Sequence, residues 1–209
     1  MQESFSETGR LLGCDDSEER QKLLAKLFTA HKQRLRLMVQ LRLHPRLYQT
    51  LDPSDALQEA FLVASKRLEE YLGDPRMPLF LWLRLITAQK LHELHSFHLG
   101  IQKRDARRGV PLDGYAGPAA STVALANRLL SPRDSPSEVA MQSEKCHRVK
   151  DAIDKMHPLD REILALRFYE SLTSAEAAQA LEIEEEAARK RYLRAMKRLK
   201  GFLEEFKEG

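Results

Sequence analysis

The feature that most constrains the fold is a short capped helix followed by a long basic helix near the C-terminus. Thr173 precedes Glu176 by three positions, the spacing of a capping box that satisfies backbone N–H groups at a helix start. After a break at 182–184, apolar or small residues recur at helical spacing from Ala188 to Leu203, which predicts one buried helix face. Together the two segments predict a helix-turn-helix.

The second helix of this pair is expected to expose a strongly basic side. No acidic residue occurs from Ala187 to Leu203, whereas seven cations do: Arg189, Lys190, Arg191, Arg194, Lys197, Arg198 and Lys200. Such a field attracts a polyanion, and a helix-turn-helix presents its second helix to the DNA major groove. The same charge distribution also suits the helix macrodipole, since Glu184, Glu185 and Glu186 precede the cations. Plain helix stabilisation is therefore the competing interpretation of the charges.

The composition is that of a soluble globular protein, with 209 residues, 43% hydrophobic and 31% charged content, and a formal net charge of +3. No apolar run reaches the roughly 18 residues of a membrane span, and the N-terminus lacks the features of a secretory signal. We therefore expect a cytoplasmic protein without membrane insertion. Cys14 and Cys146 stand far apart with no ligand-spaced partner, which predicts free thiols and no metal site.

Proline and glycine divide the chain into two parts. From Gly109 to Pro136 the sequence concentrates helix breakers and small polar residues, a composition typical of a linker. Only 122–130 within it has the pattern of a helical turn. No stretch shows the sustained period-two alternation of a strand. We predict an all-α fold: a helical domain over 17–108, a flexible linker over 109–140, and a helix-turn-helix domain over 141–206.

Helical periodicity and caps define the N-terminal domain. A helix is predicted from about Ser17 to Leu43, where His44-Pro45 ends it. A second helix begins with Asp52 as N-cap and Pro53 at its first position, and a third, apolar nearly all round, runs from Leu79 to about Gly100. The expected buried stripes comprise Leu24, Phe28, His31, Leu35 and Met38 on the first helix, and Leu57, Phe61, Ala64 and Leu68 on the second.

Two motifs, in this order, carry a resemblance to a known family. The first is Ser54-Asp55-Ala-Leu-Gln58-Glu59-Ala-Phe61, followed by Trp82-Leu-Arg-Leu-Ile86 and Gln89. The second comprises Leu159 to Glu170, Glu176 to Leu181, and Arg191 to Leu199. They resemble the second and fourth conserved regions of bacterial RNA polymerase sigma factors, of the small extracytoplasmic-function type of the sigma-70 family. The third region of larger sigma factors is absent, as this type implies.

The resemblance implies a task for each region. Residues 17–108 would form the domain that binds core polymerase and reads and melts the minus-ten element, and 141–206 the domain that reads the minus-35 element. The loop from Tyr71 to Pro78 would hold a flipped base, whereas Trp82 is expected to pack in the core. The implied polymerase-binding residues are Asp55, Gln58, Glu59 and Phe61. The implied DNA-binding residues are Arg76, Gln89, Lys90 and His92 at the minus-ten element, and Glu186, Arg189, Lys190, Arg191, Arg194 and Lys197 at the minus-35 element.

Two features need their own interpretation. The recognition helix begins with Glu185 and Glu186, where the family usually has small or hydroxyl residues, and a glutamate in the groove can accept a hydrogen bond from cytosine N4. His92, His95 and His98 recur every three residues, but without a cysteine or carboxylate cluster they do not indicate a metal site.

We therefore expect a promoter-recognition subunit with no catalytic chemistry and no cofactor. Its expected partners are core RNA polymerase, promoter DNA, and an anti-sigma factor or another inhibitor. We also expect the free protein to be compact or clamped by that inhibitor, because tethering raises the effective concentration of the second DNA-binding module. Two other classes fit the pattern. One is a stand-alone helix-turn-helix regulator that binds operators as a dimer and uses its N-terminal helices as a sensing or dimerisation module. The other is a helical adaptor with a fortuitously basic C-terminal helix.

Overall fold

The computed structural model describes residues 2–43, 47, 51–99, 119–130 and 136–205, and every regular element within them is a helix. The elements are α1 (Gln2–Leu12), α2 (Ser17–Arg42), α3 (Pro53–Gly73), α4 (Leu79–Leu99), α5 (Thr122–Leu129), α6 (Pro136–Asp154), α7 (Pro158–Leu164), the π-helix η3 (Ala165–Tyr169), α8 (Ser174–Ala180) and α9 (Glu185–Glu205). This confirms the all-α prediction. Residues 100–118 and 131–135, which include nearly half of the predicted linker, lie outside the described part.

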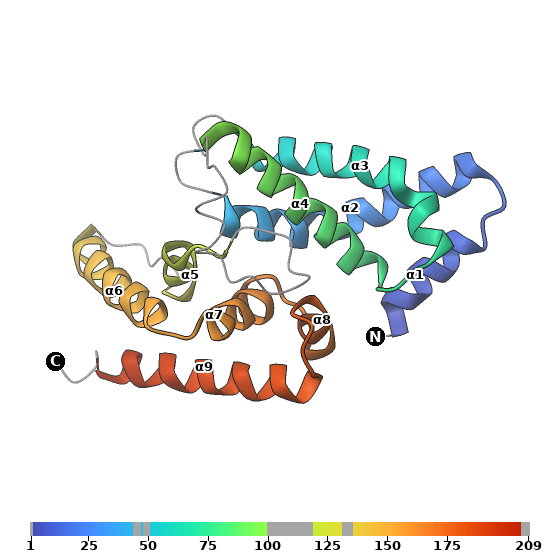
Figure 1. Cartoon of the computed structure of the whole chain (residues 1–209). Coiled ribbons are helices and arrows are strands. Elements are labelled where there is room, and N and C mark those ends of the chain that lie inside the picture. Colours follow the sequence, from blue (N-terminus) through green and yellow to red (C-terminus); the bar gives the residue numbers. More distant parts are fainter. Residues whose placement is uncertain (1, 44–46, 48–50, 100–118, 131–135, 206–209) are drawn as a thin grey trace.

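The N-terminal half is a bundle of α2, α3 and α4 with α1 against it (Figure 1). The predicted cap is present, since the Asp52 carboxylate accepts from the Ser54 backbone N–H at 2.6 Å and Pro53 opens α3. The expected stripes are buried, except that His31 and Phe61 are only partly buried. Helix α1 was not predicted; it lies ahead of residue 17 and packs against α2, α3 and α4.

The C-terminal half contains the predicted helix-turn-helix. Both halves of the capping box form: the Thr173 hydroxyl accepts from the Glu176 backbone N–H at 3.1 Å, and the Glu176 carboxylate accepts from the Thr173 N–H at 2.7 Å. The turn between α8 and α9 includes Glu182 at a φ of 51°, a conformation that favours glycine. In Figure 1, α9 runs along the outer edge of this half, with α7 and α8 between it and the N-terminal bundle. Helix α5 forms within 122–130, where the sequence predicted a helical turn. Helix α6 also begins inside the predicted linker, at Pro136.

The transition from α7 to η3 widens the helix just before Glu170. Ala165–Tyr169 forms a π-helix, and the Glu170 N–H donates to the Ala165 carbonyl at 2.9 Å, an i to i−5 bond. Ser171 follows at a φ of 58°, which turns the chain sharply away. Single π-helical turns inside α-helices occur frequently at functional positions. Here the wide turn presents Glu170 to the N-terminal half.

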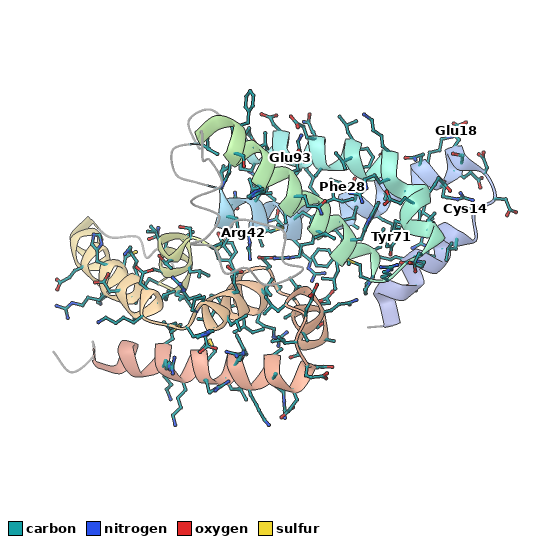
Figure 2. All side chains as sticks on the ribbon, viewed as in Figure 1. Cys14, Glu18, Phe28, Arg42, Tyr71 and Glu93 are labelled. Carbon is teal, nitrogen blue, oxygen red and sulfur yellow. The ribbon has the colours of Figure 1, made fainter. Side chains whose placement is uncertain are left out.

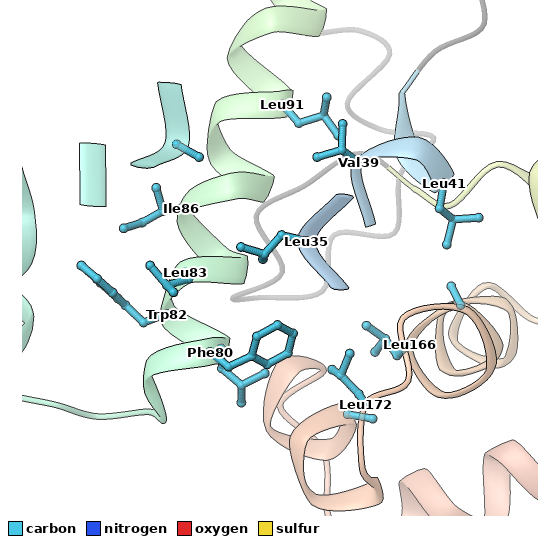
Figure 3. Close-up of a cluster of buried hydrophobic side chains, with 14 of the residues drawn as sticks. Leu35, Val39, Leu41, Phe80, Trp82, Leu83, Ile86, Leu91, Leu166 and Leu172 are labelled. Carbon is cyan, nitrogen blue, oxygen red and sulfur yellow. The ribbon is translucent and has the colours of Figure 1, made fainter. Parts of the chain in front are cut away.

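One hydrophobic core runs through both halves. Figure 3 shows Leu166 and Leu172 of the C-terminal half on the other side of the boundary from Phe80 and Leu35, and all four side chains are at most 1% exposed. The Ser121 N–H ahead of α5 donates to the Leu41 carbonyl at 2.9 Å, which joins the end of α2 to the second half. The two helical domains therefore pack directly on each other.

Candidate nucleic-acid interface

The outer side of α9 carries the predicted basic surface, but its cations are not equally available. Arg194 and Lys197 are exposed. Arg189 donates to the Glu186 carboxylate at 2.9 Å, and Lys190 lies 3.5 Å from the same group. These cations hold the pKa of Glu186 below its ordinary value, mainly through the hydrogen bond from Arg189. The predicted groove residue Glu186 is thus an ionised carboxylate that already has basic neighbours on its own helix.

Arg191 points back toward the protein. Its guanidinium donates to the Asp160 carboxylate of α7 at 3.0 Å, and its side chain is only 27% exposed. Arg198 approaches the other oxygen of Asp160 at 3.6 Å but remains 55% exposed. The sequence pattern placed all the cations on the exposed side of α9. The difference arises because Asp160, 7% exposed, needs a cationic partner where α7 packs against α9.

The acidic face of α3 is open to solvent. Asp55, Gln58 and Glu59 are exposed, and the side chain of Leu62 beside them is 57% exposed. Phe61 differs from its neighbours, because its ring meets that of Phe28 edge to face at 5.1 Å and packs against the core. Asp55, Gln58, Glu59 and Leu62 therefore form a surface suited to a protein partner, and Phe61 packs beneath this surface.

Lys90 connects this acidic face to α4. Its ammonium group lies 2.7 Å from Glu59 and 3.2 Å from Glu93. The hydrogen bond to Glu59 is the main reason that the pKa of Lys90 is raised. Gln89 is half-buried and His92 is exposed. The structure thus brings one predicted polymerase-binding residue and one predicted minus-ten residue into direct contact.

The loop between α3 and α4 is held from behind by aromatic side chains. The Tyr71 hydroxyl donates to the Met77 carbonyl at 2.9 Å and lies 2.8 Å from the Thr8 hydroxyl of α1. Tyr71 (Figure 2) also stacks on Trp82 at a centroid distance of 4.4 Å. Trp82 is 7% exposed, which confirms it as a core residue. At the tip, Arg76 is 82% exposed and lies 2.6 Å from Asp74.

The two α4 histidines whose side chains are described, His92 and His95, differ in exposure. His95 is buried at 8% exposure, whereas His92 is exposed. Among the described residues no group of histidine, cysteine and carboxylate side chains is placed to hold a metal ion. In the same residues, no helix has the length and apolar character needed to cross a membrane.

A buried ion cluster between the two domains was not predicted. Arg42, the last residue of α2, bonds Glu170 and also lies 2.8 Å from Glu162. Arg84 of α4 donates to Glu170 at 2.7 Å. Burial alone raises the pKa of Glu170, but the charges of Arg42 and Arg84 outweigh it, so the pKa lies below its ordinary value. The one sequence signal was Arg84, a charge inside the otherwise apolar run from Leu79 to Ile86.

Comparison with known proteins tests the resemblance directly. Residues 146–199, which span most of α6 to α9, match the family model described as sigma-70, region 4. The helix-turn-helix domain therefore belongs to the sigma-70 region 4 family. A curated protein of Xanthomonas campestris pv. campestris, "Probable RNA polymerase sigma factor RfaY", is 34% identical over 142 residues, which cover 68% of this chain. The aligned part spans only 31% of that relative's length.

A solved structure has the same fold across nearly the whole chain. The structure of CnrH in complex with the cytosolic domain of CnrY aligns with a TM-score of 0.52 and 18% identity, covering 95% of each chain. At this identity the likeness concerns the fold alone. It supports the two-domain helical architecture, while the region 4 match assigns the helix-turn-helix to the sigma-70 family.

Proposed function

We propose that the chain is a sigma factor of the extracytoplasmic-function type, which binds core RNA polymerase and directs it to specific promoters. One observation carries the proposal: the sigma-70 region 4 match falls on a helix-turn-helix whose first helix has a complete capping box and whose second helix exposes a basic side. In this role the chain acts in the cytoplasm and contributes binding surfaces without a cofactor. Core RNA polymerase carries out the catalysis.

The polymerase contact is proposed for the open face of α3. Asp55, Gln58 and Glu59 present acidic and amide groups around the exposed Leu62. An apolar centre with a charged rim is the usual composition of a protein interface, and complementary potentials speed association with a basic partner. Phe61 contributes by packing beneath this surface rather than by touching the partner.

The DNA contacts are proposed for two separate surfaces. At the minus-35 element, Arg194 and Lys197 of α9 are the strongest candidates for phosphate contacts because they are exposed. Arg189 and Lys190 must share their charge with Glu186, and Arg191 is committed to Asp160. At the minus-ten element, the exposed Arg76 and His92 would contact the backbone, with Gln89 and Lys90 at the edge of that surface.

Glu186 is proposed to influence base preference. A carboxylate at the start of a recognition helix can accept from cytosine N4, and the lowered pKa keeps it ionised at neutral pH. Replacing it with glutamine should change the preferred base at one position of the minus-35 element, as measured by selection of binding sites from a randomised pool with the holoenzyme. An unchanged preference would exclude a readout role.

Run-off transcription with core RNA polymerase on genomic fragments tests the proposal as a whole. A promoter-specific product that requires this chain is the expected result. Tight, specific duplex binding without polymerase, and no polymerase-dependent transcript, would instead identify a stand-alone regulator. Absence of both would favour an adaptor role. An anti-sigma factor or another inhibitor is the remaining proposed partner, and co-purification with the full chain would identify it.

A further inference from the structure

We propose that the buried ion cluster is a latch that closes the two domains of the free protein over part of their own DNA-reading surfaces. The cluster consists of Arg42 and Arg84 from the N-terminal domain and Glu162 and Glu170 from the C-terminal domain. The assignment of the covered surfaces to DNA reading rests on the function proposed above. The closure of the two domains is inferred from this chain alone. The inference concerns how the sigma factor is kept from DNA, not which promoter it reads.

The cluster is completely enclosed by the two domains. The side chains of Arg42 and Glu170 are 0% and 1% exposed, and those of Arg84 and Glu162 are 5% and 6% exposed. Arg42 is the shared member, since it bonds both carboxylates, and its position between the halves is visible in Figure 2. The second oxygen of Glu162 accepts from the Ala120 N–H at 2.9 Å. Each carboxylate therefore has its arginine partner only while the domains are together.

The contacts beside the cluster involve the elements that would read DNA. The Gln179 amide of α8 donates to the Arg76 carbonyl, in the loop proposed to hold the minus-ten base, at 3.3 Å. Arg34 of α2 lies 3.2 Å from Glu176, the capping residue of α8, and its guanidinium also donates to the Ser171 carbonyl. The first helix of a helix-turn-helix crosses the DNA backbone. In the closed protein the N-terminal domain abuts that helix, and α8 in turn contacts the loop.

An ionic latch of this kind can be opened by exchange. Buried charges have a large desolvation cost, and only correct pairing offsets it. When the domains separate, all four groups regain water, so a partner that holds the domains apart does not leave a buried charge unpaired. A purely apolar interface would regain no comparable hydration free energy when the domains separate. The cluster thus favours one closed geometry and keeps the closed state openable.

The two native cysteines provide a direct measurement of closure. Cys14 lies between α1 and α2, Cys146 lies in α6, and the 209-residue chain contains no other cysteine. Spin labels on both, in the full chain without polymerase or DNA, should give one narrow distance distribution by electron double resonance. Glu170→Gln removes one carboxylate charge and keeps the side-chain shape. It should increase the population with longer distances, relative to the closed population, by at least about tenfold. A tenfold change in this ratio corresponds to about 1.4 kcal/mol.

Two control variants separate latch opening from unfolding. Glu69→Gln removes the same charge from an exposed ion pair with Arg20 inside the N-terminal domain, and should leave the distribution unchanged. The combination Arg42→Met, Arg84→Met, Glu162→Gln and Glu170→Met replaces the cluster by groups of similar size, and should remain closed. A broad distribution in the unsubstituted protein, or a narrow one in Glu170→Gln with helical content retained, would overturn the latch.

The occlusion is tested separately with a labelled 30-base-pair duplex of arbitrary sequence at fixed salt. Glu170→Gln should bind it about tenfold more tightly than the unsubstituted protein, and the fourfold variant should bind no more tightly. Equal affinity for an opened and a closed protein would overturn the occlusion. Failure of the run-off transcription assay, by contrast, would affect the proposed function and leave the distance measurement valid.

Discussion

Arginine–carboxylate pairs occur in two regions of this molecule, and their surroundings give them opposite consequences. On α9, Glu186 bonds Arg189 with both side chains more than half exposed, at 52% and 61%. Between the domains, Glu170 bonds Arg42 and Arg84 with none of the three above 5% exposed. The chemical groups are the same. Their exposure to water determines how much stability is lost when one member of a pair is removed.

Exposed pairs contribute little to stability because water and salt compete with them, typically less than about 1 kcal/mol. Such cations remain available to exchange a carboxylate partner for a phosphate. Buried pairs show little net gain over apolar packing, yet loss of one member leaves a charge without water or partner. The comparison teaches that α9 is built to exchange partners, whereas the interdomain cluster fixes a geometry.

Removal of a buried member should have the largest effect. Glu170→Ala is expected to weaken closure by about 3–5 kcal/mol, because Arg42 and Arg84 then both lose the buried Glu170 carboxylate. Calorimetry should show one cooperative transition for the unsubstituted protein and two separate transitions for the variant. The matched change Glu186→Ala on α9 should shift stability by about 0.5 kcal/mol or less. A single unchanged transition in Glu170→Ala would erase the distinction between the two regions.

Acid should reproduce that change without a substitution. The pKa of Glu170 lies below its ordinary value of 4.5 in the closed state, and the ordinary value returns when the domains open. The contribution of this carboxylate to closure is therefore fully present above about pH 4.5 and is lost as the pH falls through the lowered value. Small-angle scattering should show the radius of gyration increasing in that acidic range, with retained helicity. A similar profile in Glu170→Gln would assign the change to other groups.

Charge reversal on the α3 surface should affect binding and not stability. Asp55→Lys combined with Glu59→Lys is expected to abolish co-purification with core polymerase, because like charges across an interface cost several kcal/mol. The melting temperature should change little, since surface substitutions typically shift stability by about 0.5 kcal/mol. Glu69→Lys combined with Glu70→Lys, at the other end of α3, is the matched control and should retain polymerase. If both variants retain polymerase equally, the polymerase-binding surface lies on another part of the molecule.

Two arginines on α9 should differ although they are three residues apart. Arg194→Ala should lower the slope of log affinity against log salt by about 0.9, the value for one phosphate contact. Arg191→Ala should leave the slope nearly unchanged and instead destabilise the C-terminal domain by about 1 kcal/mol, through the lost bond to Asp160. Salt titrations of holoenzyme on promoter DNA measure the first effect, and urea unfolding measures the second. Equal salt slopes would show that both arginines contact phosphate.

The smallest expected effect concerns the turn that leads into α9. Glu182 has a φ of 51°, which costs a residue with a side chain about 1 kcal/mol more than glycine. Glu182→Gly should therefore stabilise the C-terminal domain by about 0.5–1 kcal/mol, with unchanged DNA affinity. Thermal unfolding checks this outcome. Destabilisation would indicate that the Glu182 side chain contributes to the turn.

The sequence predicted those features that depend on neighbours along the chain. The Asp52-Pro53 start of α3, the Thr173–Glu176 capping box and the basic side of α9 all follow from residues within one or two helical turns. Helix α1 was missed although its own residues are amphipathic, and its position depends on contacts such as Thr8 with Tyr71, 63 positions away. Tertiary packing of this kind overrides local propensity.

The partners of individual charges were least predictable. Arg191 and Arg194 look equivalent in the sequence, and only the position of Asp160, 31 residues before Arg191, distinguishes them. Glu170 and Arg42 are separated by 128 positions, and Arg84 reaches the same carboxylate from a third segment. No local pattern encodes such a meeting. Arg84 is the one charge in its apolar run, but nothing in the surrounding sequence identifies the carboxylate that it pairs with.

The wide turn η3 has a consequence for how relatives should be aligned. A residue added to a helix rotates everything after it by about 100°, because a turn contains about 3.6 residues. The π-helical turn over Ala165–Tyr169 accommodates an additional residue immediately before Glu170. A relative of equal length whose helix is a continuous α-helix here would direct the glutamate at this position about 100° away from the boundary. A relative that is one residue shorter and continuous needs a single-residue gap at this turn for its glutamate to align with Glu170.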